Sequence, residues 1–175
     1  MKYKGSNLHL TDEDITQMNV DVIVNAANSR LAGGGGVDGA IHRAAGPGLH
    51  EACMALNGCP TGSAKITPGF RLPAKHIIHA VGPVWRDGQQ GEAGLLEGCY
   101  IKSLELATEH GCSSIAFPNI STGIYGYPKH DAAKVAVGAV YEFLDTHDVS
   151  LDVYFVCFDR ENYRIYNEML NPSST

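Results

Sequence analysis

The sequence has no cluster of lysine or arginine, and its formal net charge is −6 over 175 residues. A protein that binds nucleic acid mainly through phosphate contacts needs such a cluster, so nucleic acid is not expected as the main partner. A ligand that carries phosphate would therefore have to be held by backbone N–H groups and helix ends rather than by cationic side chains.

Pairs of cysteines at CxxC spacing are also missing. The five cysteines stand at positions 53, 59, 99, 112 and 157, an odd number that fits neither a disulfide framework nor a zinc site. We expect them to be reduced, buried thiols. His76 and His79 have odd spacing on one expected strand and would point to opposite faces, so they do not form a metal site. No metal and no redox cofactor are expected.

Long apolar runs are absent as well. The first ten residues lack the apolar core of a signal peptide, and no run approaches the length of a membrane span. The expectation is a cytoplasmic protein. At 44% hydrophobic residues the chain is long enough for one well-buried core and short for two. With no internal repeat or low-complexity segment, we predict one domain over residues 1–175.

The most informative stretch is residues 25–42. It begins where the apolar run Val20 to Val24 ends, contains four consecutive glycines at 33–36, and returns to apolar residues at helical spacing from Val37. This order predicts a strand, a glycine loop and a helix. The loop could simply be flexible. We favour phosphate binding, because the loop opens directly onto a helix N-terminus, where free N–H groups attract anions.

Two common phosphate-binding motifs fit this loop poorly. A Walker motif needs a lysine followed by serine or threonine after its last glycine, and neither follows here. Gly34, Gly36 and Gly39 satisfy G-x-G-x-x-G, but the first of them lies about ten residues beyond the strand. The pattern alone is therefore weak evidence for a Rossmann fold.

The remaining pattern predicts an α/β protein. Expected strands cover residues 7–10, 20–24, 63–67, 75–81, 113–117 and 151–158, and expected helices cover 37–45, a segment ending near 56, then 95–110, 129–145 and 161–170. The second half alternates strand and helix, which implies parallel pairing and a three-layer sandwich. The first part is less regular, so we expect a mixed sheet.

Glycine and small polar residues gather after the expected strands. The loops are the one that starts at Asn25, Gly82-Pro83, residues 119–126 and Phe158-Asp159. Ligands of open α/β sheets bind at the carboxyl edge of the strands, so one cleft lined by these four loops is predicted.

Several separated motifs resemble those of MacroD-type macrodomains. They are Asn25-Ala26-Ala27-Asn28 with Gly33 to Gly36, Val37-Asp38-Gly39-Ala40-Ile41-His42, Cys59-Pro60-Thr61-Gly62, Leu72-Pro73-Ala74-Lys75, and Phe117-Pro118 with Ile120 to Pro128. The resemblance runs from about Asp14 to Phe158. The chain is most similar to the bacterial O-acetyl-ADP-ribose deacetylases, which also remove ADP-ribose esterified to protein carboxylates.

The resemblance implies an α/β/α sandwich with a mixed six-stranded sheet and an ADP-ribose cleft at the loop edge. It implies that Asp14 accepts a hydrogen bond from the adenine amino group and that Phe158 packs against the adenine. The implied catalytic residues at the distal ribose are Asp38, Asn28, His42 and Tyr125. The implied ligand-binding residues are Asp14, Ile15, Asn25, Gly33, Gly34, Gly35, Gly36, Val37, Ser121, Thr122, Gly123, Ile124, Tyr125, Gly126 and Phe158.

Each of the main residues also has a purely structural interpretation. Asp38 could cap the helix, and Asn28 could be a turn residue that bonds its own backbone. His42, four residues after Asp38, could orient that carboxylate or be an ordinary surface or core histidine. Tyr125 could cover a loop rather than close over the ribose. Phe158 at a strand end would by default be core.

Two positions depart from the family pattern. Glu13 stands where many relatives have glycine, which puts the local turn in doubt, and Asn119 stands where many have a small residue, which the sequence does not explain.

Three functions fit these observations: an ester hydrolase, an ADP-ribose-binding module without activity, and, last, a dinucleotide oxidoreductase. A protein partner is a further expectation. Bacterial relatives have been linked to restraint of ribonuclease III, so this protein could contact that nuclease.

Overall fold

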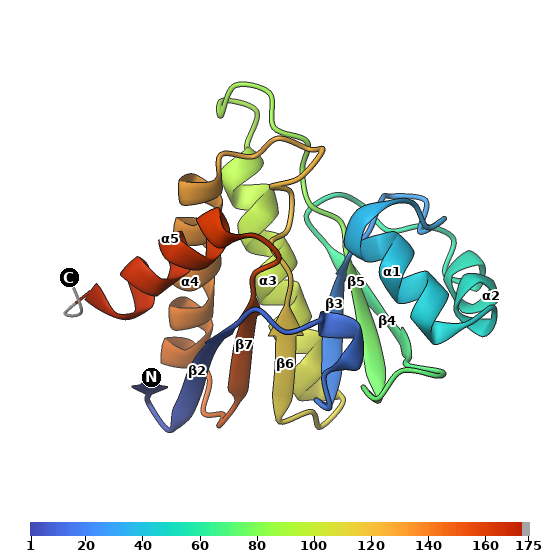
Figure 1. Cartoon of the computed structure of the whole chain (residues 1–175), viewed down its shortest axis with the longest axis horizontal. Coiled ribbons are helices and arrows are strands. Elements are labelled where there is room, and N and C mark those ends of the chain that lie inside the picture. The colour runs from blue at the N-terminus through green and yellow to red at the C-terminus, as the bar shows by residue number, and fades with distance from the viewer. Residues whose placement is uncertain (173–175) are drawn as a thin grey trace.

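A mixed sheet of seven strands runs through the structure, a computed structural model that describes residues 1–172 (Figure 1). The strand order is β1-β2-β7-β6-β3-β5-β4. The strands are β1 (Lys2–Tyr3), β2 (Ser6–Thr11), β3 (Val22–Ala26), β4 (Ala64–Pro68), β5 (His76–Ala80), β6 (Ser114–Phe117) and β7 (Asp152–Val156). The first and last neighbours, β1 with β2 and β4 with β5, are antiparallel, and all the others are parallel.

Helices cover both faces of the sheet. They are the 3₁₀ turn η1 (Ile15–Gln17), α1 (Gly36–Ala45), α2 (Gly48–Ala55), α3 (Glu92–Glu109), α4 (Lys129–Thr146) and α5 (Arg160–Leu170). One core holds the apolar residues of α3, α4 and α5, and a second core holds those of α1 and α2. The predicted three-layer α/β sandwich with a mixed sheet is confirmed.

Alternation along β3 shows how the strand serves both layers. Val22 and Val24 belong to the core under α3 and α4, whereas Ile23 between them belongs to the core under α1 and α2. All three side chains are fully buried. Successive side chains of a strand point to opposite faces, so a central strand with helices on both sides is apolar at every position.

The predicted strand count was wrong by one. The additional strand, β1, has two residues that pair antiparallel with the start of β2. A segment this short carries no periodic pattern, so only the pairing partner reveals it. The other six strands and the five helices lie where the sequence pattern placed them, with shifts of a few residues at their ends.

The carboxyl ends of β2, β7, β6, β3 and β5 meet at one edge because these strands are parallel. Hydrogen bonds join the segments that leave this edge. The Ala27 N–H donates to the Ala80 carbonyl at 2.9 Å, and the Trp85 N–H donates to the Tyr125 carbonyl at 2.8 Å. Three of the four loops predicted to share a cleft are therefore neighbours.

The loop between β5 and α3 is organised by one buried carboxylate. Glu92, the first residue of α3, is 1% exposed and accepts hydrogen bonds from the backbone N–H groups of residues 86, 87, 88 and 90. Burial alone would raise the pKa of Glu92, but these donors outweigh it and lower the pKa from 4.5 to about 2. The ionised side chain thus fixes the loop that carries Trp85.

We expect Glu92→Gln to lower the melting temperature at pH 7, because an amide offers one acceptor oxygen to a cage of N–H donors. The pKa of Glu92 is depressed in the folded state, so its stabilisation is present above about pH 4.5 and is lost as the pH falls toward about 2. The difference between the two proteins should therefore shrink over that window. Circular dichroism melts across the pH range measure this. Glu109→Gln, at the exposed end of the same helix, is the control, and a gap that is constant with pH would contradict the assignment.

Candidate active site

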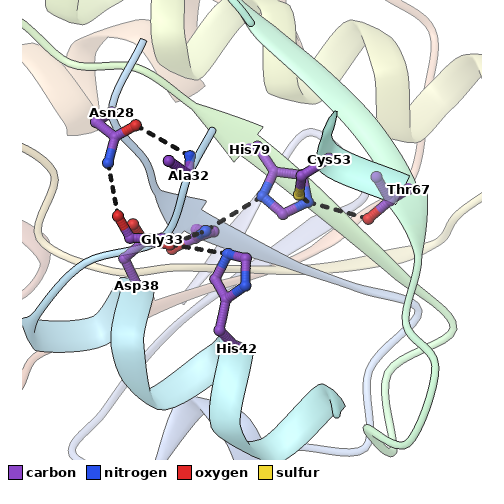
Figure 2. A network of polar contacts seen from close by, with 9 residues as sticks. Asn28, Ala32, Gly33, Asp38, His42, Cys53, Thr67 and His79 are labelled. Carbon is purple, nitrogen blue, oxygen red and sulfur yellow. Dashed lines mark hydrogen bonds and ion pairs between the residues drawn. The ribbon is translucent and has the colours of Figure 1, made fainter. Parts of the chain in front are cut away.

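The glycine loop between β3 and α1 is folded back on itself by Asn28. The Asn28 side-chain nitrogen donates to the Gly33 carbonyl at 2.8 Å, and its oxygen accepts from the Ala32 N–H at 3.2 Å (Figure 2). These are the contacts of a turn residue with nearby backbone, so Asn28 has the structural role that the sequence suggested for it. The same contacts bring the Asn28 amide to the carboxyl edge of β3, beside the loop that begins α1.

The start of α1 depends on close backbone approach. Gly35 is the N-cap and makes no side-chain capping bond. A Cβ at Gly39 would lie 2.4 Å from the Gly34 carbonyl oxygen, so the loop can pack onto the helix only because residue 39 is glycine. The first-turn N–H groups of α1 consequently lie directly below the loop, in the arrangement that favours an anion.

Asp38 lies in this first turn but does not cap the helix. Its side chain is 8% exposed, and its Oδ1 accepts a hydrogen bond of 2.8 Å from the Asn25 side-chain nitrogen. The Nε2 atom of His42, one turn further along α1, lies 3.4 Å from the same oxygen (Figure 2). The predicted contact between His42 and Asp38 is present, and the structure replaces the capping interpretation with a carboxylate held from two sides.

Asn25 lies beneath Asp38 rather than on the surface of the cleft. It is fully buried, and its side-chain nitrogen also lies 3.2 Å from Nδ1 of His79 on the neighbouring strand. The pairing of β3 with β5 places Asn25 directly opposite His79. The contact of Asn25 with Asp38 is a finding, whereas its ligand-binding role stays a prediction from the resemblance.

The second loop, residues 118–128, carries a strained serine. Ser121 is a non-glycine residue with φ of 68°, and a Cβ at Gly82 would lie 2.2 Å from its Oγ. Within the described chain this Oγ is buried and has no hydrogen-bond partner. Backbone strain and an unsatisfied buried hydroxyl both persist at functional sites more than elsewhere, so they single out this loop.

Apolar side chains stand fully exposed at the same edge. Ile124 in the second loop and Phe158, two residues past the end of β7, are each 99% exposed. A cavity of about 200 Å³ lies beside Phe158, between the end of β7 and α5. The expectation that a strand-end phenylalanine is core by default does not apply to Phe158, because the strand ends before it.

Asp14 and Tyr125 lie in the loops at this edge. Asp14 is exposed, and its Oδ1 accepts from the backbone N–H and the hydroxyl of Thr16, which fixes the turn η1 despite the preceding Glu13. Tyr125 is half-buried, and its carbonyl accepts from the N–H of Trp85. The loop that Glu92 organises therefore supports the backbone at Tyr125.

The structure explains Asn119, which the sequence did not. Its side-chain nitrogen donates to the sulfur of Cys157 at 3.6 Å, and its backbone carbonyl accepts from the Thr122 hydroxyl at 3.2 Å. Cys157 immediately precedes Phe158. Asn119 thus connects the second loop to the segment that presents Phe158, a connection that a small residue could not make.

The five cysteines are buried free thiols, as predicted. Burial raises the pKa of Cys53 and of Cys157 to about 11, so both remain protonated at neutral pH. No group of three histidine, cysteine, aspartate or glutamate side chains within residues 1–172 is placed to hold a metal ion. Over the same residues, no helix is long and apolar enough to cross a membrane.

Sequence reasoning missed His79, Thr67, Trp85 and Glu92 as residues around the site. The sequence indicates only that His79 does not form a metal site with His76. The structure separates the two, since His76 packs edge-on against His110 while His79 lies in the polar network under α1. A polar residue in a central, otherwise apolar strand was the available signal, because such a residue needs a buried partner.

Comparison with known proteins agrees with this geometry. A family model described as Macro domain matches residues 24–136, and the chain belongs to this family. The O-acetyl-ADP-ribose deacetylase of Escherichia fergusonii is 56% identical over 169 residues, which cover 94% of this chain and 96% of that protein. The protein of the same name in Escherichia coli K12 is 53% identical over 169 residues, with the same coverage of both chains.

Solved structures include similar macrodomains with ligands. A mutant macrodomain of Oceanobacillus iheyensis with ADPR is 45% identical, has a TM-score of 0.92, and is matched over 99% of this chain and 97% of that one. The Trypanosoma brucei macrodomain in complex with ADP-ribose is 42% identical with a TM-score of 0.88, over 94% of this chain and 69% of that one.

We expect Gly39→Ala to destabilise the fold by about 1–3 kcal/mol, because the added methyl group meets the Gly34 carbonyl and the glycine loop must shift. The matched control is Gly138→Ala in α4, where a Cβ would meet nothing within 4 Å. That variant should be more stable by up to about 1 kcal/mol through helix propensity. Urea unfolding of both variants measures the difference, and equal stability would rule out the close approach.

Proposed function

We propose that this protein is an ADP-ribose-binding hydrolase that cleaves esters on the distal ribose, with O-acetyl-ADP-ribose as a substrate. The observation that carries this proposal is the buried Asp38 carboxylate, which Asn25 and His42 hold below a glycine loop at the carboxyl edge of the sheet. A carboxylate next to an anionic ligand is electrostatically unfavourable, so its presence there is best accounted for by chemistry.

The diphosphate would be bound by backbone rather than by cations. Residues 33–37 and 121–126 supply N–H groups from two loops, and the N-terminus of α1 adds its dipole. The Ser121 hydroxyl, which has no hydrogen-bond partner within residues 1–172, would donate to the same diphosphate. This mode of binding suits a chain with a formal charge of −6.

The adenine would lie at the other end of the cleft. An aromatic side chain that is 99% exposed, as Phe158 is, offers a flat face for a base to stack on. Asp14 would accept from the adenine amino group with the carboxylate oxygen that Thr16 does not use. Asn28, an uncharged donor and acceptor, would then lie at the distal ribose together with Asp38.

In the proposed reaction, water attacks the acyl carbon of the ester and loses a proton to a base. The bond between that carbon and the ribose oxygen then breaks, and the ribose oxygen takes up a proton, which gives a carboxylic acid and ADP-ribose. The base is either Asp38 or the diphosphate of the substrate itself. Closure of Tyr125 over the distal ribose would exclude bulk water from the site.

The same bond joins ADP-ribose to aspartate or glutamate side chains of proteins, so mono-ADP-ribosylated proteins are a second proposed substrate class. The finer specificity depends on which acyl group fits beside Asp38. Contact with ribonuclease III stays a prediction from the resemblance, and a pull-down with that nuclease tests it.

We expect Asp14→Asn to weaken ADP-ribose binding by roughly 1.5–3 kcal/mol, the range for a hydrogen bond to a charged group. Asparagine is as good a cap as aspartate, so the bonds to Thr16 and the turn η1 should survive. Calorimetry with ADP-ribose measures the affinity, and the melting temperature of the free protein controls for the turn. An unchanged dissociation constant would place the adenine elsewhere.

If Asp38 is the general base, we expect Asp38→Ala to lower kcat by about 10²- to 10⁴-fold and to leave ADP-ribose affinity equal or improved. Affinity should not fall, because a negative charge beside an anionic ligand is removed. Single-turnover release of acetate from O-acetyl-ADP-ribose, with calorimetry on the same variant, measures both.

The matched control is Asp131→Ala, since Asp131 is an exposed aspartate in the first turn of α4 and should leave kcat unchanged. Full activity of Asp38→Ala would assign the base to the substrate diphosphate. Inactivity of the unmodified protein on every ADP-ribosyl ester would instead move the chain to the class of binding modules.

A further inference from the structure

A chain of buried polar side chains continues from Asp38 into the sheet. Asn25 donates to Asp38 at 2.8 Å, and the same Asn25 nitrogen lies 3.2 Å from Nδ1 of His79. Nε2 of His79 lies 3.0 Å from Oγ1 of Thr67 (Figure 2). Asn25 and His79 are fully buried, and Thr67 is 5% exposed. These residues come from three neighbouring strands and lie on the face that α1 and α2 cover.

Asp38 and Thr67, at the two ends of this series of side chains, fix which atom donates in each hydrogen bond. An ionised Asp38 can only accept, so the nitrogen of the Asn25 amide must face it. The same nitrogen faces Nδ1 of His79, so Nδ1 must carry a lone pair and Nε2 the hydrogen. Thr67 accepts that hydrogen, and its own hydroxyl donates to the Pro68 carbonyl at 3.1 Å.

In this orientation the side-chain nitrogen of Asn25 has two partners. Its side-chain oxygen is buried and, over residues 1–172, has no hydrogen-bond partner. An unsatisfied buried acceptor is unfavourable, so the two bonds of the nitrogen have to offset it, and one of those two partners is His79. If the amide turned over, its oxygen would face the Asp38 carboxylate and repel it.

We propose that His79 is a positioning residue for the hydrolysis: through its lone pair at Nδ1 it holds the Asn25 amide with the nitrogen toward Asp38, which keeps the carboxylate in one orientation below the glycine loop. This inference rests on the proposed function of Asp38. His79 is fully buried, and Asn25 links it to Asp38, so it acts through Asn25.

The surroundings of His79 support a neutral ring. Burial, and then the charge of His42, lower the pKa of His79 to about 4. The second group at Nε2 is the Cys53 sulfur at 3.8 Å, and burial followed by the charge of Asp38 raises the pKa of that thiol to about 11. His79 and Cys53 are therefore both uncharged near pH 7.

The test compares His79→Leu with His79→Asn. Leucine removes the acceptor, so kcat for O-acetyl-ADP-ribose should fall by roughly 10- to 100-fold, while KM and the dissociation constant of ADP-ribose stay the same. Asparagine can place an amide oxygen where Nδ1 was, so it should recover most of kcat. The matched control is His76→Leu on the same strand, whose ring packs against His110 and whose kcat should not change.

A loss of kcat in His79→Leu that asparagine does not recover, or a parallel loss in KM, would overturn the positioning role. Full activity of His79→Leu would also overturn it. The proposed function would still stand in that case, because it is tested by the activity of the unmodified protein. If His79→Leu does not fold, Thr67→Val replaces it, since valine has the shape of threonine but offers no acceptor to Nε2, and it should lower kcat alone.

A spectroscopic measurement on the unmodified protein decides the tautomer independently. In long-range ¹H–¹⁵N spectra of histidine-labelled protein, His79 should be neutral with its hydrogen on Nε2, and should stay so as the pH falls until about 4. Hydrogen on Nδ1, or a charged His79 ring at neutral pH, would contradict the proposed direction of the hydrogen bonds.

Discussion

The hydrogen bond between the Asn25 amide and the Asp38 carboxylate joins the sheet to its first helix, and the site depends on it. The Asp38 side chain is only 8% exposed, and a buried carboxylate is strongly unfavourable unless its oxygens are hydrogen-bonded. The bond exists because β3 carries Asn25 on the face that α1 covers, while the glycine loop is long enough to bring Asp38 back over it. Helix, strand and loop are therefore positioned by one buried polar contact.

Glycine lets this acidic protein build its cleft from backbone. At Gly39 and at Gly82 a side chain would collide with the opposing loop, at 2.4 Å from the Gly34 carbonyl and 2.2 Å from the Ser121 hydroxyl. At Gly39 a loop lies directly on helix α1, and at Gly82 one loop lies directly on another. Since glycine is entropically unfavourable to order, the loops need external supports.

Those supports connect loops that are distant in sequence. Glu92 fixes the segment around residues 86–90, Trp85 donates to the Tyr125 carbonyl, and Asn119 contacts Cys157. The second loop, residues 118–128, is thus held by polar contacts with the segments on both sides of it. Such contacts fix a loop without filling the space that a ligand would take.

The sequence by itself determined the layers, the family and the edge at which the loops gather, because apolar periodicity and the position of glycine after a strand are local properties of the chain. It could not determine β1, which has two residues and exists only through its pairing with β2. Nor could it show what Asn25, His79 and Thr67 do. Their contact depends on strand order and register, which set Asn25 beside His79 across β3 and β5 and Thr67 next to them on β4. Only the tertiary structure decides such pairings, because residues separated by tens of positions meet through the packing of the whole sheet.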